Sequence, residues 1–167
     1  MKNPFGEVDA TMDEQLFTQK LLESEGMLYR VACALLRNKA DRQDAMQETA
    51  MKAWQNRGRL REERYFKTWI TRIMVNECKN LHRKNDRLIL METLPEQTAP
   101  TEDRELRMML ETLPEQQRIP LVLHYLEGFS LEEISKVQHI SIGMVKYRMY
   151  QARKALRVEW NGREEQK

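Results

Sequence analysis

The chain has 167 residues, of which 41% are hydrophobic and 32% are charged. This length and composition suit one domain, or two small ones, with enough apolar material for a compact core. No apolar run reaches the roughly 18 residues of a membrane span, and the N-terminus lacks the apolar core of a signal peptide. Cys33 and Cys78 lie far apart, outside any Cys-x-x-Cys spacing, which argues against a disulfide scaffold or a zinc ribbon. We therefore expect a cytoplasmic protein with no membrane insertion of its own.

The formal net charge of +2 conceals a strong segregation of charge along the chain. Residues 1–26 carry a net charge of −4, residues 27–87 carry +8, residues 88–117 carry −5 and residues 118–167 carry +3. Two basic segments separated by an acidic one suggest two modules that each face a polyanion. Ordinary variation along a highly charged helical protein is the alternative explanation.

Apolar residues recur with helical spacing through the first half of the chain. One apolar face runs through residues 27–36, and a second helix is predicted over residues 41–56, with Met46, Ala50 and Trp54 pointing inward. A third helix is predicted over residues 65–84. No segment alternates apolar and polar residues for long enough to predict a strand. The first module is therefore predicted to be a small helical bundle.

A linker is predicted between two modules. Pro95 and Pro100 lie among small and acidic residues, a composition that cannot sustain a helix. The predicted fold class is all-α, with two small helical modules over residues 1–87 and 103–167. A flexible linker over residues 88–102 is expected to join them.

The second module contains the pattern of a helix-turn-helix. Ser130 and Glu133 have the spacing of a capping box, which would begin a short helix. Residues 138–141 are predicted to form a tight turn, and Ser141 to cap a longer helix over about residues 142–158. Two helices joined by so short a turn resemble the helix-turn-helix of DNA-binding proteins.

The predicted final helix has the charge of a DNA-reading helix. Residues 141–158 hold five Lys or Arg residues and no acidic residue. Lys146, Tyr147, Tyr150 and Gln151 lie within two turns near its N-terminus, where a recognition helix meets base edges in the major groove. The cations would supply affinity for the phosphates. The pattern therefore predicts DNA binding, with a basic solvated helix as the alternative.

The helix predicted over residues 65–84 presents a second candidate nucleic-acid surface. Steps of three or four residues place seven side chains on one face: Tyr65, Trp69, Arg72, Asn76, Lys79, Asn80 and Arg83. Aromatic rings can stack on unpaired bases while cations follow the backbone. The preceding residues 57–64 add four arginines and Gly58. Trp69 fits a core position equally well. In that case the Arg, Asn and Lys side chains of this face would still be available to bind nucleic acid.

A third candidate surface lies on the helix predicted over residues 41–56. Its outer side is expected to show Asp44, Gln47, Glu48 and Met51. An exposed methionine among polar groups suits contact with a partner helix. A plain solvated face explains the pattern equally well.

Enzyme signatures are missing from the sequence. It has no glycine-rich phosphate loop, no His-Glu-x-x-His and no Gly-x-Ser-x-Gly, and its three histidines are scattered. We therefore expect no catalytic residue, no metal and no cofactor.

Several segments resemble the extracytoplasmic-function sigma factors, a group of small bacterial initiation factors of the sigma-70 type. Residues 41–54 are similar to conserved region 2.2 of that family, and residues 66–80 to its regions 2.3 and 2.4. Residues 113–118, 127–134 and 142–149 resemble parts of region 4. The resemblance extends over about residues 25–158 in the family's order, with a linker where the family has one.

The resemblance implies a role for each candidate surface. In this family the region 2.2 helix docks on the clamp coiled coil of the β′ subunit of core RNA polymerase, which implies that contact for Asp44, Gln47, Glu48 and Met51. Residues implied to melt and hold the −10 promoter element are Arg61, Arg64, Tyr65, Trp69, Arg72, Asn76, Lys79, Asn80 and Arg83. Residues implied to bind the −35 element are Arg118, Lys146, Tyr147, Arg148, Tyr150, Gln151 and Arg153. The implied activity is promoter selection and opening for transcription initiation, and family members are commonly held inactive by an anti-sigma factor.

The second module departs from the family's pattern at four positions. His139 stands where the family's turn usually has glycine, and histidine tolerates a positive φ better than most residues, so the turn is expected to survive with some strain. Gln138 replaces a usual leucine, which should weaken the packing between the two helices. Met144 and Tyr147 replace small hydroxyl residues, which leaves the mode of binding intact but alters the expected −35 sequence.

Two other functional classes fit part of the pattern. A stand-alone helix-turn-helix repressor or activator would use the first module for sensing or dimerisation. An adaptor could mimic these folds without binding DNA. The arginine-rich segment and the aromatic, basic face favour a sigma factor over a repressor, because a protein that binds only duplex DNA needs no stacking surface. The basic final helix argues against the adaptor.

Overall fold

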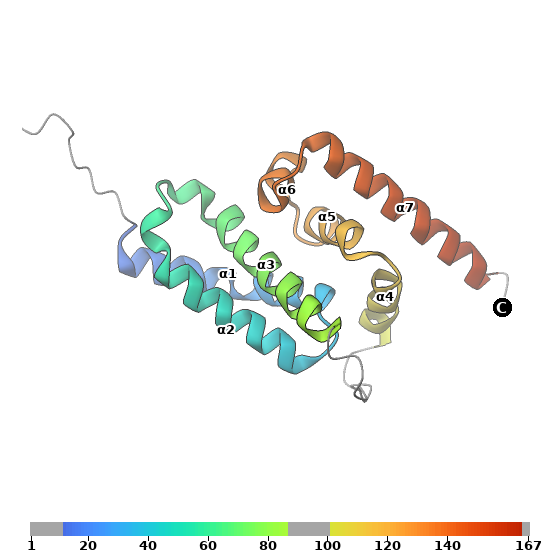
Figure 1. Ribbon diagram of the computed structural model, residues 1–167, viewed down its shortest axis with the longest axis horizontal. Helices are drawn as coiled ribbons and strands as arrows, with labels where there is room; N and C mark the ends of the chain where they lie inside the picture. Colours follow the sequence, from blue (N-terminus) through green and yellow to red (C-terminus); the bar gives the residue numbers. More distant parts are fainter. Residues whose placement is uncertain (1–11, 87–100, 165–167) are drawn as a thin grey trace, which may run out of the picture.

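The computed structural model describes residues 12–86 and 101–164 (Figure 1). These two ranges contain seven α-helices, two short 3₁₀ turns and no strand. The helices are α1 (Glu14–Leu35), α2 (Lys39–Gln55), α3 (Phe66–Asp86), α4 (Thr101–Glu111), α5 (Glu115–Tyr125), α6 (Leu131–Gln138) and α7 (Ile142–Glu164), and the turns are η1 (Arg57–Arg59) and η2 (Glu63–Tyr65). The all-α prediction is confirmed. Most of the predicted linker lies outside the described residues, and its last two residues already belong to α4.

The first three helices form a bundle around an aromatic and aliphatic core. Phe17, near the start of α1, is fully buried and contacts the ring of Phe66 edge-on, with the centroids 5.5 Å apart. Ile70 and Met74 of α3 are also fully buried. The Asn38 side chain accepts a hydrogen bond from the Asp41 N–H and so caps the N-terminus of α2.

The side of α2 that faces the core differs from the prediction by a small rotation about the helix axis. The buried residues are Arg42, Ala45, Thr49 and Ala53, whereas Trp54 is 40% exposed. Two of these buried residues are polar and are satisfied inside the bundle. Arg42 donates to the carbonyl oxygens of Leu36 and Arg37 where α1 ends, and the Thr49 hydroxyl donates to a methionine sulfur. Because Arg42 and Thr49 are polar, a hydrophobicity pattern assigns both residues to the surface although they are buried.

The second module folds as the predicted helix-turn-helix. Ser130 and Glu133 form the reciprocal capping box that begins α6, and the Ser141 hydroxyl accepts the N–H of Met144 at the start of α7. Between the two helices His139 adopts φ 53° and ψ 46°, the left-handed conformation expected there. Gln138 is buried, and neither atom of its amide group has a hydrogen-bond partner. The Gln138 side chain therefore occupies a core position without satisfying its polar atoms.

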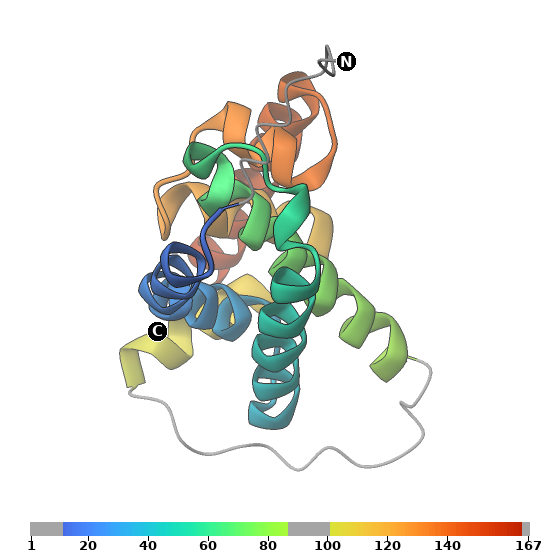
Figure 2. The same cartoon turned by 90° about the vertical axis from the view of Figure 1, so that its left-hand side faces the viewer.

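The two modules pack directly on each other. Figure 1 shows α1 to α3 on one side and α4 to α7 on the other, and Figure 2 shows the molecule from the side of α1 to α3. Helix α1 contacts α4 and α5, and α3 contacts α6. One hydrophobic cluster includes Val31 and Met74 of the first module together with Leu123, Phe129 and Ile134 of the second. A smaller cluster joins Ala34 of α1 to leucines of α4 and α5. Each of these two clusters therefore contains residues of both modules.

Cys33 and Cys78 are both free thiols. Cys78 of α3 is buried, and this burial, reinforced by the carboxylates of Glu115 and Glu77, raises the pKa of its thiol to about 12. Cys33 is partly exposed. None of the helices in the two described ranges is long and apolar enough to cross a bilayer.

Candidate nucleic-acid and polymerase interfaces

The exposed side of α7 carries most of the residues predicted to bind the −35 element. Val145, Met149 and Ala152 are buried against the module, so the opposite side of the helix faces outward. Tyr147 and Tyr150 are 58% and 56% exposed. In Figure 1, α7 lies along the outer edge of the second module, on the side away from α1 to α3. Exposed residues on this α7 face are Lys146, Tyr147, Tyr150 and Arg153, with Arg148 and Gln151 partly exposed beside them.

Arg118 does not join this face, so the structure does not support its predicted contact with DNA. The residue is only 7% exposed, and one terminal guanidinium nitrogen donates to the carbonyl oxygens of Leu113 at 2.9 Å and Glu111 at 3.5 Å. Both carbonyls lie where α4 ends, so Arg118 satisfies acceptors that the helix leaves free. Burial lowers the pKa of the guanidinium, partly offset by the Glu111 carboxylate. Arg118 therefore has a structural role.

The α3 face combines an exposed polar half with a half-buried aromatic half. Asn76, Asn80 and Arg83 are exposed, and Lys79 is partly exposed. Trp69 is partly buried, because it packs against Phe17 with ring centroids 6.2 Å apart. Trp69 is therefore neither fully buried nor fully exposed: its indole packs on the core and remains partly open to solvent.

Charged side chains from both modules surround the aromatic end of the α3 face. Tyr65 is 38% exposed, with the Arg64 guanidinium 4.8 Å from its ring centroid. Lys136 of α6 also lies over this ring, with Nζ 5.2 Å from the centroid. Arg61 is exposed in the preceding loop, whereas the Nε of Arg72 is buried without a hydrogen-bond partner. The sequence placed Tyr65 and Arg72 on one face, but it did not indicate the contact of Lys136 with Tyr65.

The α2 face lies on the outer surface of the first module. Asp44, Gln47 and Met51 are exposed and Glu48 is partly exposed. Because Trp54 also points outward, this face is more apolar than predicted: its indole extends the surface by one turn beyond Met51. The Arg57 guanidinium stacks on that indole, 4.2 Å from the ring centroid. Trp54 is the surface residue that the sequence analysis did not predict. The small residues Ala45 and Ala53 share one helix face with Thr49, and this spacing could have indicated that they, rather than Trp54, face the core.

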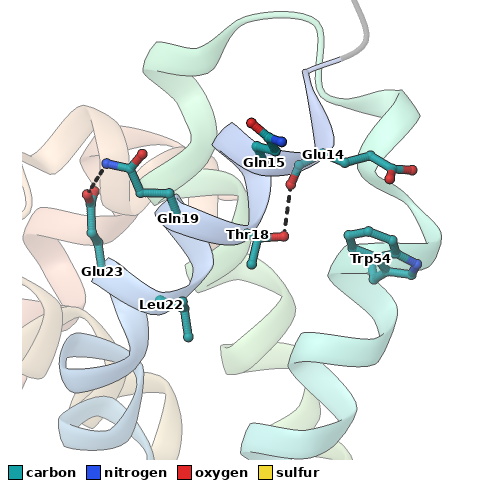
Figure 3. Close-up of a pocket in the computed structure, with 7 residues that line it drawn as sticks. All are labelled: Glu14, Gln15, Thr18, Gln19, Leu22, Glu23 and Trp54. Carbon is teal, nitrogen blue, oxygen red and sulfur yellow. Dashed lines mark hydrogen bonds between the residues drawn. The ribbon is translucent and has the colours of Figure 1, made fainter.

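A shallow groove adjoins Trp54 between α1 and α2 (Figure 3). Its walls come from the first turns of α1 and from the Trp54 indole, with Leu22 exposed at one end. Two hydrogen bonds within α1 stiffen its polar wall: Thr18 Oγ1 donates to the Glu14 carbonyl oxygen, and Gln19 Nε2 donates to a Glu23 carboxylate oxygen. The groove is open, and Leu22 and Trp54 make it a continuation of the α2 face.

Among the residues with described positions, no cluster of His, Cys, Asp or Glu is arranged to hold a metal ion.

Both modules match known protein families in the order found here. Residues 21–88 match the family described as Sigma-70 region 2, and residues 103–156 match Sigma-70, region 4. These matches cover α2, α3 and most of α1 in the first module, and α5, α6 and most of α7 in the second.

Curated relatives and a solved structure agree with these family matches. The ECF RNA polymerase sigma factor EcfG of Rhodopseudomonas palustris is 30% identical over 131 residues, which cover 72% of this chain and 72% of that protein. The ECF RNA polymerase sigma-E factor of Salmonella typhimurium is 31% identical over 134 residues, covering 68% of this chain and 70% of the relative. The sigma factor RpoE from Bartonella quintana, solved in complex with the anti-sigma factor NepR, has a similar structure. It superposes with a TM-score of 0.73 and 28% identity, over 84% of this chain and 93% of that one. With both regions matched in order, the chain belongs to the extracytoplasmic-function family of RNA polymerase sigma factors, which direct promoter recognition and transcription initiation.

Proposed function

We propose that this sigma factor contacts core polymerase and promoter DNA through the three faces described above. The α2 face would dock on the clamp coiled coil of the β′ subunit, the α3 face would hold the melted −10 element, and the α7 face would bind the −35 element. The corresponding modules would span residues 1–87 and 103–167, joined by residues 88–102. The observation that carries the proposal is the outward, acid-free N-terminal half of α7, which is the second helix of the helix-turn-helix.

The chemistry of the α7 face supports a role in reading duplex DNA. Lys146 and Arg153 are cations at the surface, and Gln151 has the amide that can pair with an adenine edge. Tyr147 and Tyr150 add hydroxyl donors and apolar rings. Arg118 is not part of this proposed surface, because its guanidinium donates to the Leu113 carbonyl oxygen inside the module.

The chemistry of the α3 face supports contact with unpaired DNA. Asn76, Lys79 and Arg83 would follow the sugar-phosphate backbone along the helix, while the rings of Tyr65 and Trp69 offer stacking surfaces. A base that leaves the duplex costs a few kcal/mol of unstacking, which such a surface could offset. Melting would then be a binding effect, with no covalent step and no catalytic side chain.

An anti-sigma factor is a further proposed partner. The superposed RpoE was solved with the anti-sigma factor NepR, and the likeness extends over 84% of this chain. A regulator of that kind would keep the DNA-binding faces from a promoter until it is released.

Transcription with purified components tests the proposal. The protein is added to core polymerase and a promoter library, and specific run-off transcripts are sequenced. We expect transcripts from a defined promoter class; no transcript together with no binding to core enzyme would overturn the proposal. Replacing both Asn76 and Lys79 with alanine should impair open-complex formation while core binding is retained. Loss of core binding in that variant would show that the α3 face is misassigned.

A further inference from the structure

An exposed tyrosine at the end of α5 lies beside the α7 face. Tyr125 is the last residue of α5 and is 58% exposed. Its hydroxyl oxygen accepts a hydrogen bond from Nη1 of Arg153, with the two atoms 3.4 Å apart. Arg153 is one of the exposed residues of the α7 face, so this contact extends that face onto a second helix.

Buried packing beneath the pair fixes the two helices relative to each other. Leu121 and Val122 of α5 belong to the same hydrophobic cluster as Ala152 of α7. Val122 and Ala152 are almost completely buried. Because Ala152 precedes Arg153 in the chain and Val122 lies one turn before Tyr125, the two exposed side chains stand on adjoining, immobilised backbone segments.

The ring of Tyr125 is also supported from one side. The ring of His124 contacts it edge-on, with the centroids 5.0 Å apart and the planes at 79°. The imidazole is held in turn by the loop that follows α5: its Nδ1 donates to the carbonyl oxygen of the fully buried Phe129 at 2.8 Å. The Tyr125 hydroxyl is therefore presented beside Arg153 by a series of local contacts.

The position of Arg153 along α7 places it near the phosphate backbone of a bound duplex. Lys146 and Arg153 are separated by about two turns and so lie on the same side of the helix. A recognition helix meets base edges with its N-terminal residues. Arg153 lies about 16 Å along the axis from Ile142, where α7 begins, so it would meet the edge of the groove rather than its floor.

The pair has hydrogen-bond donors left for an anion. A tyrosine hydroxyl has one proton and two lone pairs, so Tyr125 can accept from Arg153 and still donate. The guanidinium has five N–H groups, and none of the ion pairs formed within residues 12–86 and 101–164 involves Arg153. Hydrogen bonds from such groups to a phosphate are assisted by charge and are stronger than neutral ones.

We propose that Tyr125 and Arg153 form a two-donor phosphate site at the edge of the α7 face. The Tyr125 hydroxyl orients the guanidinium and donates its own proton to the same phosphate group of duplex DNA. The inference rests on the proposed role of the α7 face in binding the −35 element. Phosphate contacts carry no sequence information, so the pair adds affinity and sets the position of α7 on the duplex without selecting a sequence.

Binding of the full chain to two short labelled duplexes tests the site. One duplex carries a promoter selected by run-off transcription, and the other has a mixed sequence. Tyr125→Phe removes only the hydroxyl group and should weaken binding to both duplexes by about threefold in fluorescence anisotropy. Arg153→Met should weaken both by about tenfold and lower the salt slope by about one ion.

Two variants in the first module serve as matched controls. Tyr29→Phe removes a hydroxyl group from an exposed tyrosine of α1, and Lys20→Met removes one charge from a lysine that pairs with Glu63. Neither should change the affinity for either duplex by more than about twofold. Circular dichroism checks that every variant is folded.

The double variant decides whether the two residues act together. Adding Tyr125→Phe to Arg153→Met should cause little further loss, because the hydroxyl acts on the same phosphate as the guanidinium. Full additivity of the two losses would overturn the shared site, and an unchanged affinity in either single variant would overturn it as well. A loss confined to the promoter duplex would identify a base contact in place of the phosphate. If the wild type binds neither duplex, the proposed function of the α7 face fails, and this inference fails with it.

Discussion

The guanidinium of Arg118 and the backbone of Leu113 are joined by a 2.9 Å hydrogen bond at the end of α4. Arg42 does the same for α1, since its guanidinium donates to the carbonyl oxygens of Leu36 and Arg37. Each arginine belongs to a later helix and satisfies acceptors that an earlier helix leaves free. Two of the chain's many cations are thus structural elements of the two modules.

Replacing Arg118 with methionine should destabilise the protein without changing how it contacts DNA. The Leu113 and Glu111 carbonyls would lose their buried donor, at a cost of about 1–3 kcal/mol in the free energy of unfolding. Lys146→Met is the reciprocal control. It should change stability by less than about 0.5 kcal/mol and lower the salt dependence of binding to duplex −35 DNA by about one ion. Urea unfolding and salt titrations measure both quantities, and a changed salt slope in the Arg118 variant at unchanged stability would restore Arg118 as a DNA contact.

Replacing Gln138 with leucine should stabilise the second module. Both amide atoms of Gln138 are buried without a partner, and such a group costs about 1–3 kcal/mol in desolvation. Leucine has a similar volume and no polar atom, so we expect a higher urea midpoint with an unchanged slope. The neighbouring exposed residue Lys136 offers a control: Lys136→Leu should not give a comparable gain. A lower midpoint for the Gln138 variant would show that the amide is satisfied by water.

Replacing Trp54 with alanine should weaken binding to core polymerase. An exposed indole beside Met51 is the kind of residue that dominates a protein interface, so we expect a loss of about tenfold or more in affinity. Tyr29→Ala is the control, because Tyr29 is a comparably exposed aromatic residue on α1, outside the α2 face. Titration of fluorescent core enzyme measures both variants. Equal affinities for the two would remove Trp54 from the interface.

The two thiols should differ in reactivity in the native protein. Burial raises the Cys78 pKa to about 12 from its ordinary value near 9, so at pH 8 this thiol is protonated and shielded. A thiol reagent should therefore modify Cys33 rapidly and Cys78 only after denaturation. Because the raised pKa favours the protonated thiol in the folded state, its contribution to stability is complete below the ordinary pKa and is lost as the pH rises toward 12. Rapid reaction at both sites would show that α3 opens locally.

The sequence predicted α2, α3, α6 and α7 well because their signals are local, whereas α1 begins at Glu14, well before the predicted apolar face over residues 27–36. The Ser130 and Glu133 capping box, the Ser141 cap and the left-handed His139 all lie in the expected positions. Two kinds of information were missing from the pattern. Arg118 could not be distinguished from a DNA-binding cation, because its carbonyl partners are set by where α4 ends in space. The packing of α6 on α3 was also not predicted, because Phe129 and Ile134 fit the core of the second module alone as well as a core shared with the first.

Phe17 connects two tryptophans that serve different proposed partners. Its ring contacts Trp54 edge-on at 5.8 Å and Trp69 at 6.2 Å, centroid to centroid. The indole assigned to polymerase and the indole assigned to DNA therefore both contact a single buried ring. Intrinsic tryptophan emission can consequently report on both encounters without an added label: a displacement of Phe17 on either side changes the surroundings of both indoles.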